Sequence, residues 1–136
     1  MIYIGIDTGT HTGVAIWDAK YKLFVDITTL KIDEAFEIIL LYKEAEKDDI
    51  FVKFEDARLR KWYGNSGREK LQGAGSIKRD CVIWEDFLKR KKIQYKAVPP
   101  KNNTTKLSKE AFMNITKYEG ITSEHSRDAA MLVFGI

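Results

Sequence analysis

Four residues from three distant parts of this sequence have the side chains of a divalent-metal site. Asp7 and Glu55 each end a short apolar segment, and Asp128 lies in a stretch with helical periodicity, three residues after His125. Residues three apart on a helix share one face. Carboxylates brought close together repel unless a cation neutralises them, and oxygen ligands favour Mg²⁺ or Mn²⁺ over softer metals. The pattern predicts a metal site if the fold brings these segments together.

Such a site is suited to the hydrolysis of phosphodiesters. Two bound ions about 4 Å apart can activate a water molecule and stabilise the leaving oxygen. Taken alone, each carboxylate also has a structural interpretation, because Asp7 precedes a Thr-Gly-Thr turn and acids at strand ends are common on protein surfaces. Their agreement in position favours the metal site. Whether Asp56 or Glu124 assists the metals is open at this point.

Segments with regular hydrophobic patterns must position these residues. Apolar or alternating runs predict strands, and apolar residues at helical spacing predict helices. The predicted strands are 2–7, 14–17, 23–27, 50–55 and 93–98. The predicted helices are 33–47, 71–92, 108–117 and a last one that is capped by Thr122 or Ser123 and reaches the C-terminus. Residues 57–70 read as a polar, basic loop.

The element order, βββαβαβαα, predicts an α/β protein with a mixed five-stranded sheet flanked by helices. It resembles the order of the ribonuclease H-like fold, in which the first and fourth strands are parallel neighbours. Asp7 and Glu55 would then lie at the same edge of the sheet, where open α/β sheets place their sites. We expect a single domain over residues 1–136.

The composition is that of a folded protein rather than a disordered, secreted or membrane one. Hydrophobic residues make up 44% of the chain, and no apolar run approaches the roughly 20 residues that span a bilayer. The N-terminus lacks the basic and apolar regions of a signal peptide. The only cysteine, Cys81, lies in an apolar helical pattern that predicts a buried structural thiol. We expect a cytoplasmic protein with no membrane association.

The middle of the chain is basic and aromatic. Between Arg58 and Lys96 there are 12 Lys and Arg residues against 4 Asp and Glu residues, although the net charge is only +3. This distribution favours a polyanionic partner, and a solvated basic face explains it equally well. Such side chains close to Glu55 could guide phosphates and stack on bases. The predicted DNA-binding residues are Arg58, Arg60, Lys61, Trp62, Tyr63, Arg68, Lys78 and Arg79.

The predicted helix 71–92 carries an apolar stripe at alternating spacings of three and four residues. Its residues are Ala74, Ile77, Cys81, Trp84 and Leu88. The stripe is suited to packing on the protein's own sheet, and part of it could form a contact between two copies of the chain.

Three motifs, in order along nearly the whole chain, resemble those of the RuvC family of Holliday-junction resolvases. Residues 4–9 (Ile-Gly-Ile-Asp-Thr-Gly) with 13–15 (Gly-Val-Ala) look like the first motif, and 54–56 (Phe-Glu-Asp) resemble the second. Residues 125–130 (His-Ser-Arg-Asp-Ala-Ala) are similar to the C-terminal motif, and the glycines of 71–75 resemble the start of the family's long helix. The chain is shorter than typical bacterial members and its middle loop differs, which suggests a compact resolvase of phage or mobile-element type.

The resemblance implies a magnesium-dependent endonuclease that resolves four-way or other branched DNA by paired symmetric nicks. It implies a homodimer with one active site per subunit. By resemblance, Asp7, Glu55 and Asp128 are ligands of two Mg²⁺ ions, for which Mn²⁺ can substitute. His125 takes the fourth position, where it binds metal or polarises the attacking water. Lys106 could contact the scissile phosphate or neutralise transition-state charge, and a surface lysine is the other interpretation.

Three other functions stay open at this point. The first turn is also typical of ATP-binding proteins of the actin and sugar-kinase class, although those need two domains. YqgF-type nucleases that process ribosomal RNA share the first motif, but a strand-end glutamate followed by a basic loop argues against that group. A non-catalytic module that binds branched DNA would keep the fold, and the intact set of site residues argues against it.

Overall fold

The computed structural model describes residues 1–59, 68–100 and 106–136, and for residues 68–74 it describes the backbone alone. Its centre is a five-stranded mixed sheet in the order β3-β2-β1-β4-β5. β1 (Ile2–Asp7), β2 (His11–Asp18) and β3 (Leu23–Lys31) form an antiparallel meander. β4 (Ile50–Glu55) pairs in parallel with β1, and β5 (Gln94–Val98) pairs in parallel with β4. The predicted α/β class, the element order and the parallel β1–β4 pair are confirmed, and this is the arrangement of the ribonuclease H-like fold.

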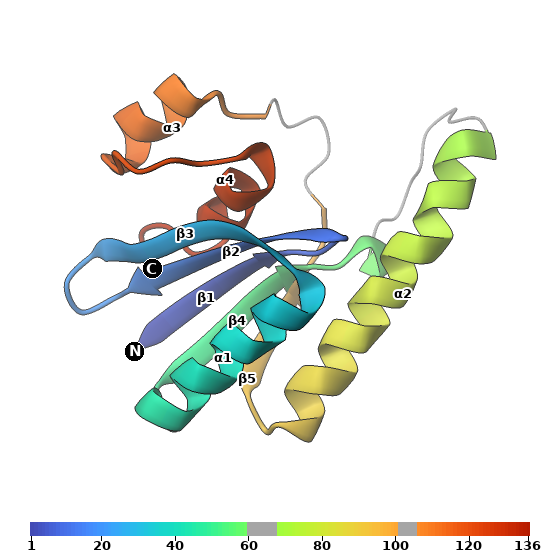
Figure 1. Ribbon diagram of the computed structural model, residues 1–136, viewed down its shortest axis with the longest axis horizontal. Coiled ribbons are helices and arrows are strands. Elements are labelled where there is room, and N and C mark those ends of the chain that lie inside the picture. The colour runs from blue at the N-terminus through green and yellow to red at the C-terminus, as the bar shows by residue number, and fades with distance from the viewer. Residues whose placement is uncertain (60–67, 101–105) are drawn as a thin grey trace.

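Helices cover both faces of the sheet (Figure 1). α1 (Ile32–Glu46) and α2 (Arg68–Arg90) pack on one face, and α3 (Lys109–Thr116) and α4 (Glu124–Met131) lie on the other. Successive side chains of a strand point to opposite faces. Ile4 and Ile6 of β1 and Val52 and Phe54 of β4 are fully buried on the α1–α2 face. The residues between them therefore point to the α4 face.

The apolar stripe of α2 is only partly covered. Cys81, Trp84 and Leu88 are fully buried in the core that α2 shares with the sheet and α1. Ile77 is 44% exposed, and the Ala74 side chain lies outside the described residues. Burial raises the pKa of the Cys81 thiol. The prediction of a buried structural thiol is confirmed, and the stripe packs on the protein's own sheet over its C-terminal half.

Four predicted boundaries are wrong. β2 begins at His11 instead of residue 14, because its first residues pair with the end of β3. α4 ends at Met131 instead of reaching the C-terminus, and residues 132–135 form turns. The reason is packing: Val133 is buried on the sheet, and the carbonyl of Ile136 accepts a hydrogen bond from Trp17 Nε1 at 3.1 Å. β3 continues to Lys31 because it pairs with β2 as far as His11. The predicted loop 57–70 contains a 3₁₀ turn, η1 (Ala57–Leu59), and the first residues of α2.

No helix in the described ranges is long and apolar enough to cross a membrane.

Candidate active site

Asp7 and Glu55 lie at the carboxyl ends of two neighbouring parallel strands. β1 and β4 pair in register up to Ile6 and Phe54, and Asp7 and Glu55 are the next residues along each strand. Ile6 and Phe54 are buried on the α1–α2 face. Because successive side chains of a strand point to opposite faces, the two carboxylates that follow them point toward the α4 face. The sheet thus presents both predicted carboxylates at one edge and on one face.

Two glycines allow α4 to lie directly on the sheet beside Asp7. A Cβ atom at Gly5 would lie 2.0 Å from the carbonyl oxygen of Ala129, and one at Gly13 would lie 2.1 Å from that of His125. Any larger side chain at these positions would push the helix away from the strands. Gly13 pairs with Asp7 across β1 and β2. The contact at Gly13 therefore brings the first turn of α4 to Asp7.

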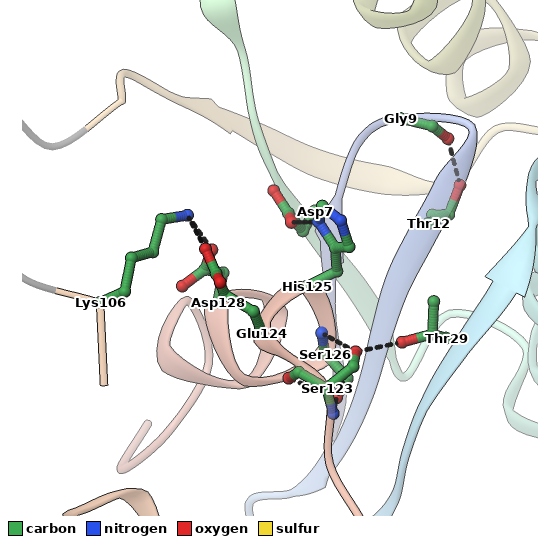
Figure 2. A network of polar contacts seen from close by, with 10 residues as sticks. All are labelled: Asp7, Gly9, Thr12, Thr29, Lys106, Ser123, Glu124, His125, Ser126 and Asp128. Carbon is green, nitrogen blue, oxygen red and sulfur yellow. Dashed lines mark hydrogen bonds and ion pairs between the residues drawn. The ribbon is translucent and has the colours of Figure 1, made fainter. Parts of the chain in front are cut away.

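Hydroxyl groups fix the start of α4 (Figure 2). Ser123 Oγ accepts a hydrogen bond from the Ser126 N–H at 3.1 Å, and Ser126 Oγ accepts one from the Ser123 N–H at 2.8 Å. The Ser123 hydroxyl also shares a hydrogen bond with Thr29 Oγ1 of β3. Of the two predicted caps, Ser123 is the one used. Sequence reasoning missed Thr29 because its partner lies 94 residues away, and no local pattern links them.

His125 contacts Asp7 directly (Figure 2). Its Nδ1 lies 3.0 Å from Oδ2 of Asp7. Burial raises the pKa of Asp7; the hydrogen bond with His125 opposes this rise, and the charge of Asp128 adds to it. The Asp7 side chain is 16% exposed and that of His125 is 53% exposed. Asp7 is therefore a largely desolvated acid whose nearest partner is open to solvent.

Lys106 binds the outer side of α4. Its Nζ forms an ion pair with Asp128 and lies 3.6 Å from Oε1 of Glu124 (Figure 2). The hydrogen bond to Asp128 raises the pKa of Lys106. Arg127 Nε donates to the carbonyl of Leu107 at 3.0 Å, which fixes the residue after Lys106 against α4. The predicted site lysine thus faces one of the predicted metal ligands.

The donor set suits a hard divalent cation. Asp7, Glu55 and Asp128 contribute carboxylate oxygens, and the nearby charge of Asp128 already raises the pKa of the half-buried Asp7. As the side chains stand, no three His, Cys, Asp or Glu residues within the described ranges are close enough together to hold a metal ion. Asp128 is turned to Lys106. Assembly of the set around a cation therefore requires Asp128 to leave Lys106, and the assignment of metal ligands stays a prediction.

Asp56 faces away from this group. It is buried, and Arg58 donates to both of its carboxylate oxygens, with Nη2 at 2.6 Å from Oδ2. The same guanidinium lies 3.4 Å from Oε1 of Glu85 on α2. Burial acts to raise the pKa of Asp56, but the hydrogen bonds and charge of Arg58 hold it below its usual value. Asp56 is therefore held in an ion pair that joins the end of β4 to α2.

The predicted DNA-binding residues fall into three groups. Arg58 is engaged with Asp56, as described above. Lys78 and Arg79 are exposed on α2. The others lie outside the described residues, either entirely (Arg60, Lys61, Trp62 and Tyr63) or by their side chain (Arg68). Their role in binding DNA stays a prediction.

No known protein family and no curated protein matches the sequence. Among solved structures, the chain is similar to a Fowlpox virus resolvase that was solved in complex with its substrate Holliday junction DNA. The two are 13% identical, the match covers 96% of this chain and 84% of that chain, and the TM-score is 0.40. A similarity this weak does not bear on activity. The fold assignment rests on the strand order and strand directions given above.

Proposed function

We propose that the protein is a metal-dependent endonuclease that cuts branched DNA, with Asp7, Glu55 and Asp128 as its active-site carboxylates. The observation that supports this most directly is the position of α4, which lies on the glycines of β1 and β2 and brings His125 to Asp7. The three carboxylates would hold Mg²⁺ or Mn²⁺, two ions per site. When bound, such ions activate a water molecule and stabilise the leaving oxygen of a phosphodiester.

His125 is suited to handling a proton at this site. Its Nδ1 is bound to Asp7, which orients the ring and leaves Nε2 to exchange a proton with water. An imidazole nitrogen can accept a proton and release it again, which suits His125 to general acid–base chemistry. Because the imidazole is 53% exposed, water reaches it from the open side of α4.

Lys106 is suited to binding the substrate phosphate. Its side chain is 59% exposed while it contacts Asp128 and Glu124, so it can exchange a carboxylate for a phosphate oxygen without a change in the fold. A cation placed where charge develops in the transition state lowers the barrier to reaction.

The substrate class and the assembly belong to the same proposal. The three motifs resemble those of junction resolvases, and we infer cleavage of four-way or related branched DNA by paired symmetric nicks. A junction with two-fold symmetry is matched by a C2 pair of subunits, each of which makes one cut. The basic residues between Arg58 and Lys96 would supply the electrostatic part of DNA binding.

The test is cleavage of a labelled synthetic four-way junction with Mg²⁺, beside a linear duplex and an RNA–DNA hybrid. We expect paired nicks on the junction. Asp128→Asn should lower the rate by more than about 100-fold, because loss of a residue that merely supports a metal ligand already costs about 10–100-fold. Glu37→Gln, an exposed change on α1, is the matched control and should leave the rate unchanged.

Three results would overturn the proposal, each in favour of a different function. Cleavage of RNA or of the hybrid alone would indicate an RNA-processing nuclease. Tight junction binding with no metal-dependent cleavage would indicate a binding module. Nucleotide binding with no affinity for nucleic acid would indicate the ATP-binding class.

A further inference from the structure

The α4 face carries three cross-strand rows of side chains on β1, β4 and β5. Tyr3 lies opposite Phe51 in the first row, with ring centroids 5.8 Å apart. Lys53 lies opposite Lys96 in the second row. The third row contains the strand-end carboxylates of the candidate active site. Residues two apart along a strand are separated by about 7 Å, so the lysine row lies one such step before the carboxylates.

Within the described ranges, the helices of this face pack mainly on the other strands and leave the β4–β5 part open. α4 packs on β1, β2 and β3, and α3 reaches the same core through Phe112. On the open part, Lys96 is exposed and Phe51 and Lys53 are half-buried. Val52 points to the opposite face and is fully buried there. The lysine row is therefore accessible to a partner, in contrast to the other side of the same strands.

The lysine row has no countercharge among the described residues. Neither Lys53 nor Lys96 has a carboxylate within ion-pair distance in the described ranges. Like charges directly opposite each other on neighbouring strands destabilise a sheet. A bound polyanion would remove this repulsion, and the phosphate backbone of a nucleic acid is such a polyanion.

We propose that this surface, the Lys53–Lys96 face, binds the phosphate backbone of one DNA strand and leads that strand to the carboxylates at the end of β1 and β4. The identification of the partner as DNA rests on the proposed nuclease function. The charge of the lysine row is complementary to phosphate, and the row is continuous with the candidate active site. The half-buried rings of Tyr3 and Phe51 provide a surface on which a base can pack beyond the lysines.

Binding of a fluorescently labelled four-way junction, measured without divalent metal at several salt concentrations, tests this proposal. The slope of log affinity against log salt is negative, and each lost phosphate contact lowers its magnitude by about 0.7–0.9. Lys53→Gln/Lys96→Gln should therefore lower that magnitude by about 1.4–1.8 and weaken binding by about tenfold or more at low salt. A labelled single strand should show a change at the lower end of this range.

Lys20→Gln/Lys47→Gln is the matched control. It removes the same charge from two exposed lysines in the β2–β3 turn and in the turn before β4, away from the carboxyl ends of the strands. The slope should be unchanged in this variant. If the salt dependence of binding fell equally in the two double variants, only the net charge of the protein would matter, and the proposal would be overturned.

Two further measurements exclude a defect in folding. The Lys53→Gln/Lys96→Gln protein should melt at the same temperature as the parent or higher, because the repulsion between the lysines is gone. Lys53→Arg/Lys96→Arg keeps the charge and should bind with the parental salt slope. If the salt dependence of binding falls as much in the arginine variant as in the glutamine variant, the face does not bind phosphate and the proposal fails.

Because binding is measured without divalent metal, failure of this proposal can be distinguished from failure of the proposed nuclease function. Parental affinity and slope in Lys53→Gln/Lys96→Gln would overturn the role of the Lys53–Lys96 face, even if the protein cuts the junction. Loss of slope in that variant would support the face, even if the parent protein cuts nothing.

Discussion

Glu55 and Asp56 are adjacent in the sequence, yet they lie on opposite faces of the sheet, and each face carries its own group of charges. The Arg58 cluster, toward α2, consists of Asp56, Arg58 and Glu85. The α4 cluster, on the other face, consists of Asp7, Lys106, Glu124, His125 and Asp128. Both clusters lie at the carboxyl ends of the central strands, and both are built around a buried or half-buried aspartate.

The two aspartates differ in the charge that the protein gives them. Asp56 has a guanidinium bound to both oxygens, and its pKa is held below the usual value although burial acts to raise it. Asp7 has an imidazole as its partner, and burial raises its pKa. A permanent internal cation makes the first acid a structural part of the fold. The second acid has no such cation bound to it in the part of the chain that the structure describes, and it is the one suited to an exchangeable ligand.

Removal of the Asp56 charge should have the largest effect on stability in this comparison. Asp56→Asn should lower the free energy of unfolding by about 1–3 kcal/mol, because Arg58 loses its charged acceptor and a buried polar group is left poorly paired. Urea unfolding measures this loss. Asp48→Asn breaks an ion pair whose aspartate is 97% exposed and should change stability by less than about 0.5 kcal/mol. Parental stability in Asp56→Asn would contradict the structural role of the Arg58 cluster.

A side chain at Gly13 should separate the α4 cluster from the sheet. Gly13→Ala places a Cβ against the His125 carbonyl and should cost about 1–3 kcal/mol through overpacking, with weaker Mn²⁺ binding because α4 moves. Thermal unfolding and a Mn²⁺ titration measure the two effects. Gly75→Ala meets no atom within 4 Å on α2 and should stabilise the protein by about 0.5–1 kcal/mol. If Gly13→Ala and Gly75→Ala have the same stability and the same Mn²⁺ affinity, the close approach of α4 to Gly13 does not position that helix.

Neutralisation of Asp7 should raise the free energy of unfolding, whereas neutralisation of Asp56 should lower it. A carboxyl whose pKa is raised by folding opposes folding once it is ionised, so Asp7→Asn should stabilise the protein by about 0.5–2 kcal/mol at pH 7. The gain should shrink as the pH falls toward about 4, where the unfolded aspartate also becomes protonated. Unfolding at pH 7 and pH 5 measures it. A loss of stability at pH 7 would mean that Asp7 is a structural acid like Asp56.

Substitution of Lys106 should have the smallest effect of the four, and it should appear as a change in Mn²⁺ affinity. Its contact with Asp128 is exposed on the lysine side, and exposed ion pairs contribute about 0.2–1 kcal/mol. Lys106→Met should free Asp128 and tighten Mn²⁺ binding by up to about fivefold, as measured by calorimetry in the absence of DNA. Lys109→Met, an exposed change at the start of α3, should leave the Mn²⁺ affinity unchanged. Weaker Mn²⁺ binding in Lys106→Met would show that this lysine does not compete with the metal.

Much of the fold and part of the site could be predicted because they depend on short-range patterns. Alternation of apolar residues identifies β4 and places Glu55 at its end, and Ser123 is a helix cap by its own side chain. The boundary of α4 could not be predicted in this way, because Val133 leaves the helix to pack on the sheet. The partner of Arg58 could not be assigned either, since a basic residue beside a candidate site reads equally well as a DNA contact.

The sequence by itself determined the order of the elements, the carboxylates at the ends of β1 and β4, and the pair His125 and Asp128 on one helix. Periodicity and capping are local properties, and they act over a few residues. Only the tertiary structure decided that α4 lies on Gly13, that Arg58 binds Asp56, and that Lys53 and Lys96 face each other on an open surface. These contacts join segments through backbone approach and strand register, which depend on the packing of the whole sheet.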